Sequence, residues 1–229
     1  MERTSTTSQR WIFYSCLVLL LGLLLALSTS GLAVWNLTLL KVLQSHPTPL
    51  RDDFSILMAV IGAPFASLIF IGLLSLILLK RKRYKELALF LALFAAMTGF
   101  EYVSKMALYH PRPPDEYVRN IRPHGFFRHI PDISVPSDNS FPSGHCLRAV
   151  YLMGILGTLL RPRTSRAKAP LSFAIAIYCL AAGFTRVYLG AHWPGDVLGG
   201  FALGAMGWIT YLRGRDFFEK RLPKRLPLP

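Results

Sequence analysis

The chain has 229 residues and a formal net charge of +14 at pH 7. Hydrophobic residues make up 52% of it and charged residues only 17%, and the charges are gathered in blocks between long apolar runs. This pattern excludes an ordinary soluble domain, and the placement of the basic residues described below argues against a nucleic-acid partner.

Apolar runs of membrane-spanning length recur along the chain, and they predict an all-α fold: an integral membrane six-helix bundle formed by a single domain, residues 1–229. The expected spans are residues 11–34, 54–79, 87–108, 142–160, 171–189 and 194–212. A basic start followed by an apolar run also fits a signal peptide, but the length of the first run favours an uncleaved span. Pro142 and Pro194 are expected to open the fourth and sixth spans, because proline suits the first turn of a helix.

The segments between the spans differ in character. We expect a polar loop over 35–53, a basic turn at 80–86, a long loop over 109–141 and a second basic loop over 161–170. The residues after 212 are predicted to form a disordered basic tail. The three cysteines, Cys16, Cys146 and Cys179, lie in apolar segments, so they suggest neither a disulfide framework nor a zinc site.

The basic residues predict the orientation of the bundle. Of the 26 lysines and arginines, 17 lie at the termini and in the loops 80–86 and 161–170, and only 6 lie in the opposite loops. Because cytoplasmic loops carry the excess of Lys and Arg, both termini are expected in the cytoplasm. The loop 109–141 then lies at the outer face, and the net charge is mainly a signal of topology.

Three polar clusters interrupt the apolar sequence, and span counting places all of them at this outer face. The first is Lys105, followed after six residues by Arg112 and a proline. The second is Pro-Ser-Gly-His over 142–145, and the third is Thr-Arg at 185–186 followed by His192 and Asp196. Three cations, two imidazoles, a carboxylate and a Ser-Gly turn at a helix start suit a phosphate ester.

The order and spacing of these clusters resemble the type 2 phosphatidic acid phosphatase superfamily, also called lipid phosphate phosphatases. Its pattern reads K-x6-R-P, P-S-G-H and S-R-x5-H-x3-D, and the chain departs from it only at Thr185, where the family usually has serine. The motifs cover about ninety residues, and a hydroxyl is kept at the one difference.

The resemblance implies a role for each residue of the clusters. His192 would be the nucleophile that forms a phosphohistidine, with Asp196 holding its other nitrogen, and His145 would be the general acid and then the base. The phosphoryl oxygens would be bound by Lys105, Arg112, Arg186, Ser143 and Gly144. The resemblance implies no cofactor, and no carboxylate cluster suggests a metal.

Two charges within the spans lie outside the motifs. Glu101 precedes Lys105 by four residues, so a helical ion pair that orients the lysine is expected. Arg148 lies one turn deeper than His145 and could either reach a second phosphate or pair with a neighbouring helix. The loop histidines, His110 among them, are expected to be solvated.

The predicted function is hydrolysis of a membrane lipid phosphate or diphosphate at the outer face of the plasma (inner) membrane. Undecaprenyl diphosphate is the first candidate by resemblance, followed by phosphatidylglycerol phosphate and phosphatidic acid. A phosphotransferase on the same scaffold would use the same residues, and a transporter with a midplane site is the alternative from another class. Vanadate-dependent haloperoxidases have a similar set of site residues but are soluble.

The small residues of span 194–212 could form grooves for a lipid chain or could simply pack helices. The oligomeric state stays open.

Overall fold

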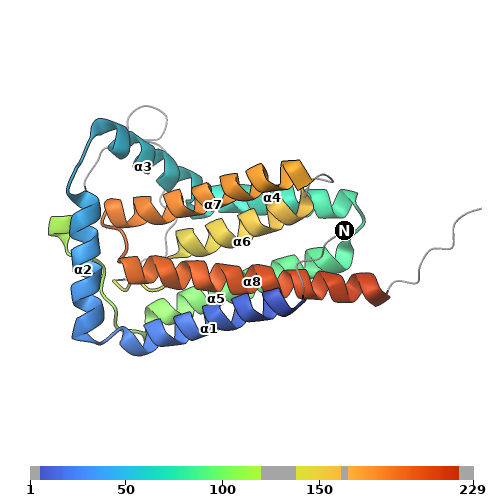
Figure 1. The fold of residues 1–229 in the computed structure, drawn as a ribbon, viewed down its shortest axis with the longest axis horizontal. Coiled ribbons are helices and arrows are strands. Elements are labelled where there is room, and N and C mark those ends of the chain that lie inside the picture. The colour runs from blue at the N-terminus through green and yellow to red at the C-terminus, as the bar shows by residue number, and fades with distance from the viewer. Residues whose placement is uncertain (1–5, 120–137, 161–164, 222–229) are drawn as a thin grey trace, which may run out of the picture.

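The computed structural model describes residues 6–119, 138–160 and 165–221. The described residues form helices joined by short connections, and an isolated β-bridge pairs Pro111 with Asn139. The helices are α1 (Thr6–Ala26), α2 (Ser30–Gln44), α3 (Pro49–Ile61), α4 (Pro64–Lys80), α5 (Tyr84–Ala107), the 3₁₀ turn η1 (Asp115–Tyr117), α6 (Gly144–Leu159), α7 (Ser165–Tyr188) and α8 (Pro194–Arg221). Most of the long helices run side by side, and α2 lies across one end of the bundle (Figure 1).

Length and apolar composition qualify three described helices as membrane spans, at Thr7–Ala26, Tyr84–Ala107 and Ala169–Tyr188. The pair α3 and α4 adds a fourth if it is counted as one span, although it is bent by 53°. Helix α6 is apolar but shorter. The all-helical class is therefore confirmed, and the count of six spans stays a prediction.

The first predicted span, 11–34, is wrong as a single helix. Helix α1 ends at Ala26 and a new helix, α2, begins at Ser30. Thr29 explains the break, because its hydroxyl oxygen accepts a hydrogen bond from the Leu32 amide and donates one to the Ala26 carbonyl. The predicted polar loop 35–53 is also wrong for the most part, since it contains the second half of α2 and the start of α3.

Helix α2 is fastened to the end of the bundle by two amide side chains. The Asn36 Oδ1 atom accepts a hydrogen bond from the Gly195 amide at 2.9 Å, which satisfies a free N–H in the first turn of α8. Gln44 Nε2 donates to the carbonyls of Tyr117 and Tyr188 at 2.8 and 2.9 Å. The helix therefore holds together the two chain segments that carry the third cluster.

The second predicted span, 54–79, is broken in the middle. Helix α3 ends at Ile61 and α4 begins at Pro64, because proline has no amide to continue the hydrogen bonds of α3. The remaining spans differ from prediction at their ends. Helix α6 begins at Gly144 rather than Pro142, and α7 begins at Ser165, inside the predicted basic loop. Helix α8 continues to Arg221, through the first half of the predicted disordered tail.

The core of the bundle is the close contact of α6 with α8. A Cβ atom at Gly204 would lie 2.5 Å from the Leu147 carbonyl oxygen, and one at Gly200 would lie 2.4 Å from the Ser143 carbonyl oxygen. Only glycine allows the two backbones to approach so closely. The first turns of the two helices are joined by a hydrogen bond from the Ser143 amide to the Asp196 carbonyl at 2.9 Å. The second and third clusters are therefore neighbours.

Candidate active site

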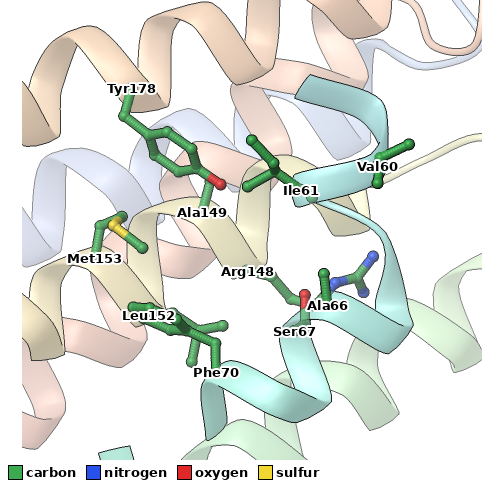
Figure 2. Close-up of a pocket in the computed structure, with 11 residues that line it drawn as sticks. Val60, Ile61, Ala66, Ser67, Phe70, Arg148, Ala149, Leu152, Met153 and Tyr178 are labelled. Carbon is green, nitrogen blue, oxygen red and sulfur yellow. The ribbon is translucent and has the colours of Figure 1, made fainter. Parts of the chain in front are cut away.

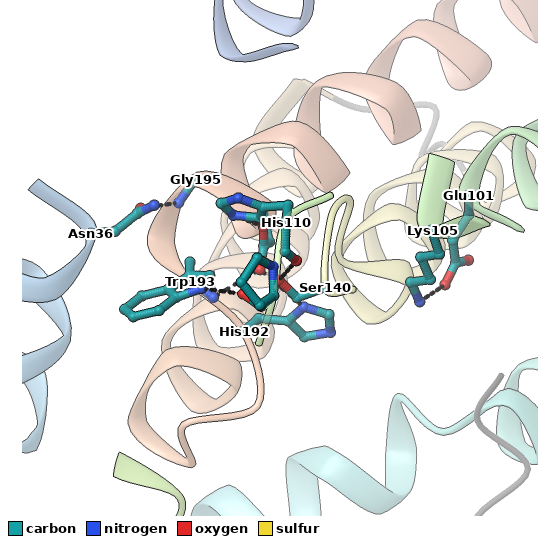
Figure 3. A network of polar contacts seen from close by, with 10 residues as sticks. Asn36, Glu101, Lys105, His110, Ser140, His192, Trp193 and Gly195 are labelled. Atoms are coloured by element: carbon teal, nitrogen blue, oxygen red, sulfur yellow. Dashed lines mark hydrogen bonds and ion pairs between the residues drawn. The ribbon is translucent and has the colours of Figure 1, made fainter. Parts of the chain in front are cut away.

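The three clusters come together at the end of the bundle that α2 covers. They lie at the end of α5, the start of α6, the end of α7 and the start of α8. Figure 3 shows Lys105 and His192 approaching the same region from different elements. The convergence predicted from the order of the spans is therefore present in the structure, although the residues 120–137 of the predicted active-site loop 109–141 lie outside the described part.

The His192 imidazole is held by the first turn of α8. Its Nδ1 atom lies 3.4 Å from Oδ2 of Asp196, the carboxylate predicted to hold it. The same oxygen accepts the Trp193 amide at 2.9 Å, and the whole Asp196 side chain is buried. An Nδ1–H directed at the carboxylate leaves the lone pair on Nε2, which is the arrangement that a nitrogen nucleophile requires.

His110 also reaches this carboxylate, and its predicted solvation is wrong. The His110 side chain is buried, and its Nε2 atom lies 3.1 Å from Oδ1 of Asp196. Within the described residues, neither atom has another hydrogen-bond partner. Asp196 therefore lies between two imidazoles. A histidine two residues before the Arg-Pro of the first cluster was a signal in the sequence, but nothing in the sequence showed which way it faced.

Asn139 joins His110 to the first cluster. Its Oδ1 atom accepts the His110 amide at 2.9 Å, and its Nδ2 atom donates to the Lys105 carbonyl at 3.0 Å. The Ser140 amide donates to the His110 carbonyl at 2.9 Å. These bonds fix the segment after α5 against the segment before α6, and they hold His110 in contact with Asp196.

Glu101 is the centre of a buried ion-pair network. One carboxylate oxygen lies 2.7 Å from Lys105 Nζ and the other lies 3.1 Å from Arg148 Nη1. The expected ion pair of Glu101 with Lys105 is confirmed. For Arg148 the sequence left two alternatives, and the structure shows the second, a pair with a residue of a neighbouring helix. The carboxylate lies so close to Gly144 that a Cβ atom there would be 2.1 Å from Glu101 Oε1. The glycine of Pro-Ser-Gly-His therefore makes room for Glu101.

His145 lies against the break between α3 and α4. Its Nε2 atom is 3.3 Å from the Ala59 carbonyl oxygen and 3.4 Å from Nη1 of Arg186. A single imidazole nitrogen cannot donate to the carbonyl and accept from the guanidinium at once. The protonation of His145 therefore decides which of the two partners it binds.

The remaining predicted ligands differ in burial. Ser143 is fully buried at the N-terminus of α6, and Arg186 is buried beside His145. The Thr185 hydroxyl donates to the Ala182 carbonyl at 3.0 Å, so it is engaged within α7. Arg112 is exposed, and the described residues give its side chain no hydrogen bond or ion pair with the other site residues. The structure thus brings together every predicted residue except the Arg112 side chain.

A second polar cluster joins three segments at the same end of the bundle. Asp52 of α3 accepts two bonds from Arg119 Nη2 at 2.8 and 3.0 Å, and it also accepts the Tyr188 hydroxyl. The Arg119 guanidinium stacks over the Tyr188 ring at 4.8 Å. The cluster connects α3, the segment after η1 and the end of α7. The sequence analysis placed Asp52 in the polar loop 35–53 and did not predict this role.

The environment of His192 favours the neutral imidazole. Burial lowers the pKa of His192 below its ordinary value; Asp196 raises the pKa in part, while the positive charges of Lys105 and Arg186 lower it. At neutral pH the ring is therefore uncharged and available as a nucleophile. Among the described residues, no group of three His, Cys, Asp or Glu side chains is placed to hold a metal ion.

The fold and the site define a helical membrane protein with a cationic, two-histidine site at one end of its bundle. The family model described as the PAP2 superfamily matches residues 87–219, which include all three clusters. The chain belongs to the PAP2 superfamily.

Several proteins with similar sequences are named for lipid phosphate or diphosphate substrates. The chain is 32% identical over 113 residues to phosphatidylglycerophosphatase B of Bacillus subtilis, which covers 48% of this chain and 53% of that protein. It is 38% identical over 77 residues to an undecaprenyl-diphosphatase of Sulfolobus acidocaldarius, covering 34% of this chain and 33% of the other. The matches therefore span about half of these relatives or less.

The fold resembles a solved membrane protein over most of its length. The crystal structure of the transmembrane PAP2 type phosphatidylglycerolphosphate phosphatase from Bacillus subtilis superposes with a TM-score of 0.73 at 24% identity. The superposition covers 94% of this chain and 100% of that one. At this identity the likeness establishes the shared fold.

Proposed function

We propose that the chain is an integral membrane phosphatase that hydrolyses a lipid phosphate or diphosphate through a phosphohistidine intermediate. One observation carries the proposal: a half-buried histidine, His192, is oriented by Asp196 and lies beside two cationic side chains, with His145 nearby. The similarity to named lipid phosphatases supports the same class of substrate.

The residues supply each step of a double displacement. Nε2 of His192 attacks phosphorus, the bond from phosphorus to the lipid oxygen breaks, and His145 donates a proton to that oxygen. His145 then removes a proton from water, which attacks the phosphohistidine and releases phosphate and the free imidazole. Asp196 stabilises the positive charge that His192 carries between formation of the phosphohistidine and its hydrolysis.

The phosphoryl oxygens would be bound by cations and by the start of α6. Lys105 and Arg186 are buried at the site, and the exposed Arg112 lies on the segment that follows α5. Ser143 and the Gly144 amide lie at the N-terminus of α6, where free N–H groups attract an anion. We propose that these fixed charges serve without a metal or another cofactor.

The position of the site suits a substrate that stays in the bilayer. We propose that the single domain, residues 1–229, crosses the plasma (inner) membrane six times, with both termini in the cytoplasm and the site at the outer face. The first turns of α6 and α8 then lie at the membrane surface, within reach of a lipid head group. Undecaprenyl diphosphate, phosphatidylglycerol phosphate and phosphatidic acid are the candidate substrates. A phosphotransferase would differ only in the acceptor that replaces water.

Phosphate release by detergent-purified protein tests the proposal. The three candidate lipids are assayed with wild type, with His192→Ala, and with His46→Ala as a control at an exposed histidine of the same end. Wild type and His46→Ala should release phosphate in the presence of a chelator, and acid-labile phosphate should be trapped on the wild-type chain. Replacement of a nucleophile should lower kcat by several orders of magnitude. Turnover by His192→Ala would refute the role of His192 as nucleophile. Turnover that requires added magnesium would refute the proposal that no metal is needed.

A further inference from the structure

An apolar cavity lies next to the site and has no part in the chemistry described above. Its volume is about 310 Å³, within the range of ligand pockets. It lies where the break between α3 and α4 faces α6 and α7. Figure 2 shows Ala66 and Phe70 of α4, Leu152 and Met153 of α6 and Tyr178 of α7 around it.

The cavity adjoins the predicted general acid. Gly62 lines it, and a Cβ atom at Gly62 would lie 2.7 Å from Cδ2 of the His145 ring. Arg148, one helical turn after His145, also lines the cavity (Figure 2). The cavity therefore begins one helical turn along α6 from His145.

The chemistry of the proposed reaction fixes which part of the substrate lies there. His145 must donate its proton to the oxygen that leaves phosphorus, and that oxygen carries the lipid. Because a general acid acts within hydrogen-bond reach, the first atoms of the lipid must lie on the His145 side of the site. The cavity begins on that side.

The alternative location, the small residues of α8, is closed. A Cβ atom at Gly199 would meet the Phe141 ring at 2.5 Å, and one at Gly207 would meet the Met97 sulfur at 2.1 Å. Gly200 and Gly204 contact the backbone of α6. These residues pack helices, so they leave no groove for a chain along that surface of α8.

The cavity wall also contains one charged side chain. Arg148 is 8% exposed, and its Nη1 atom binds Glu101. Its Nε atom has no hydrogen-bond partner among the described residues. A buried N–H without a partner costs free energy.

We propose that this cavity receives the apolar chain of the lipid phosphate substrate where the chain leaves the head group. The inference rests on the proposed function and adds to it the place of the lipid chain. The chain enters at the break between α3 and α4, and its apolar surface is buried against α4, α6 and α7.

The test fills the cavity and compares two chain lengths of one head group. Ala66→Phe places a ring in the cavity, and Leu68→Phe adds a similar ring on the outer face of the same helix, where Leu68 is 59% exposed. Dioleoyl and dibutyryl phosphatidic acid are the substrates. Ala66→Phe should lower the ratio of kcat/KM for the long chain over the short chain at least tenfold, and Leu68→Phe should keep the wild-type ratio. An unchanged ratio, or the same fall in both variants, would overturn the proposal.

Photolabelling of the wild-type protein gives a second readout that does not depend on a variant. A phosphatidic acid with a diazirine near the start of an acyl chain should label peptides of α4 and α6 that line the cavity, such as those with Phe70 and Met153. Labelling confined to α8 would overturn the proposal. Because labelling requires binding and not turnover, it locates the chain separately from phosphate release, on which the proposed function depends.

Discussion

His110 and Asp196 face each other at 3.1 Å between Nε2 and Oδ1, on the opposite side of the carboxylate from His192. The two residues come from segments 86 positions apart and meet because the segment after α5 is fastened beneath the start of α8. The contact gives Asp196 two fixed neighbours, so its orientation toward His192 does not depend on His192 alone.

Removal of His110 should therefore weaken catalysis through Asp196. His110→Ala leaves Oδ1 of a buried carboxylate without a partner, at a cost of about 1–3 kcal/mol, or roughly 5- to 150-fold in kcat. KM for the lipid should change little, because His110 does not touch the phosphate. His110→Gln, which can keep a donor near Oδ1, should recover part of the rate. A change in KM alone would contradict this positioning role.

Glu101 should contribute to stability more than any exposed carboxylate. Glu101→Gln removes the carboxylate that pairs with the buried Lys105 and Arg148, and removal of one partner of a buried pair costs about 3–5 kcal/mol. Denaturant unfolding in detergent measures the loss, and Glu116→Gln in η1, an exposed site, is the control. The double variant with Arg148→Gln should lose less than the sum of the two single variants. Strict additivity would show that the pair is not coupled.

The acid limb of the pH profile should lie below the ordinary histidine pKa of about 6.5. Burial lowers the pKa of His192, so the neutral nucleophile persists to lower pH. Asp196 raises that pKa, since a carboxylate favours the imidazolium. Asp196→Asn should therefore move the limb of kcat/KM to still lower pH, while kcat falls by about 10²–10⁴-fold.

The charged groups that shift the pKa of His192 are Asp196, Lys105 and Arg186, and the first of these is changed in the test. Asp138→Asn, at an exposed position of the adjoining segment, should leave the profile unchanged. Movement of the acid limb of Asp196→Asn to higher pH would show that another group controls it.

Cysteine labelling should give the orientation of the site. In a background with Cys16, Cys146 and Cys179 replaced by serine, Tyr109→Cys introduces a thiol at a position that is 88% exposed, at the site end of the bundle. It should react with an impermeant reagent in intact cells, whereas Lys85→Cys, at the opposite end, should react only after lysis. The reverse pattern would place the site in the cytoplasm.

The sequence alone was sufficient to predict the helical class and the residues of the three clusters. Apolar runs determine helices in a bilayer because every backbone amide must be bonded within its own segment. The alternation of the spans then predicted that Lys105, His145 and His192 share one end of the bundle. Both predictions depend on local properties of the chain, and neither requires a contact to be known.

The breaks in the helices were partly visible in the sequence. Thr29 and Pro64 are ordinary signals for a helix start, but both lie within apolar runs, and hydropathy alone passes over them. Helix α2 was missed because its buried residues, Asn36 and Leu40, are spaced one turn apart in a segment that also contains polar residues. Its place across the end of the bundle depends on a bond from Asn36 to α8, far along the chain.

Only the tertiary structure decided which groups face one another inside the bundle. His110 was expected in solvent and lies against Asp196, Arg148 is paired with Glu101, and the small residues of α8 are packed against α6 while an apolar cavity lies beside His145. The physical reason is that burial and pairing are properties of two surfaces at once. A sequence specifies each surface, but the rotation and distance of the helices decide which side chains meet and where space remains.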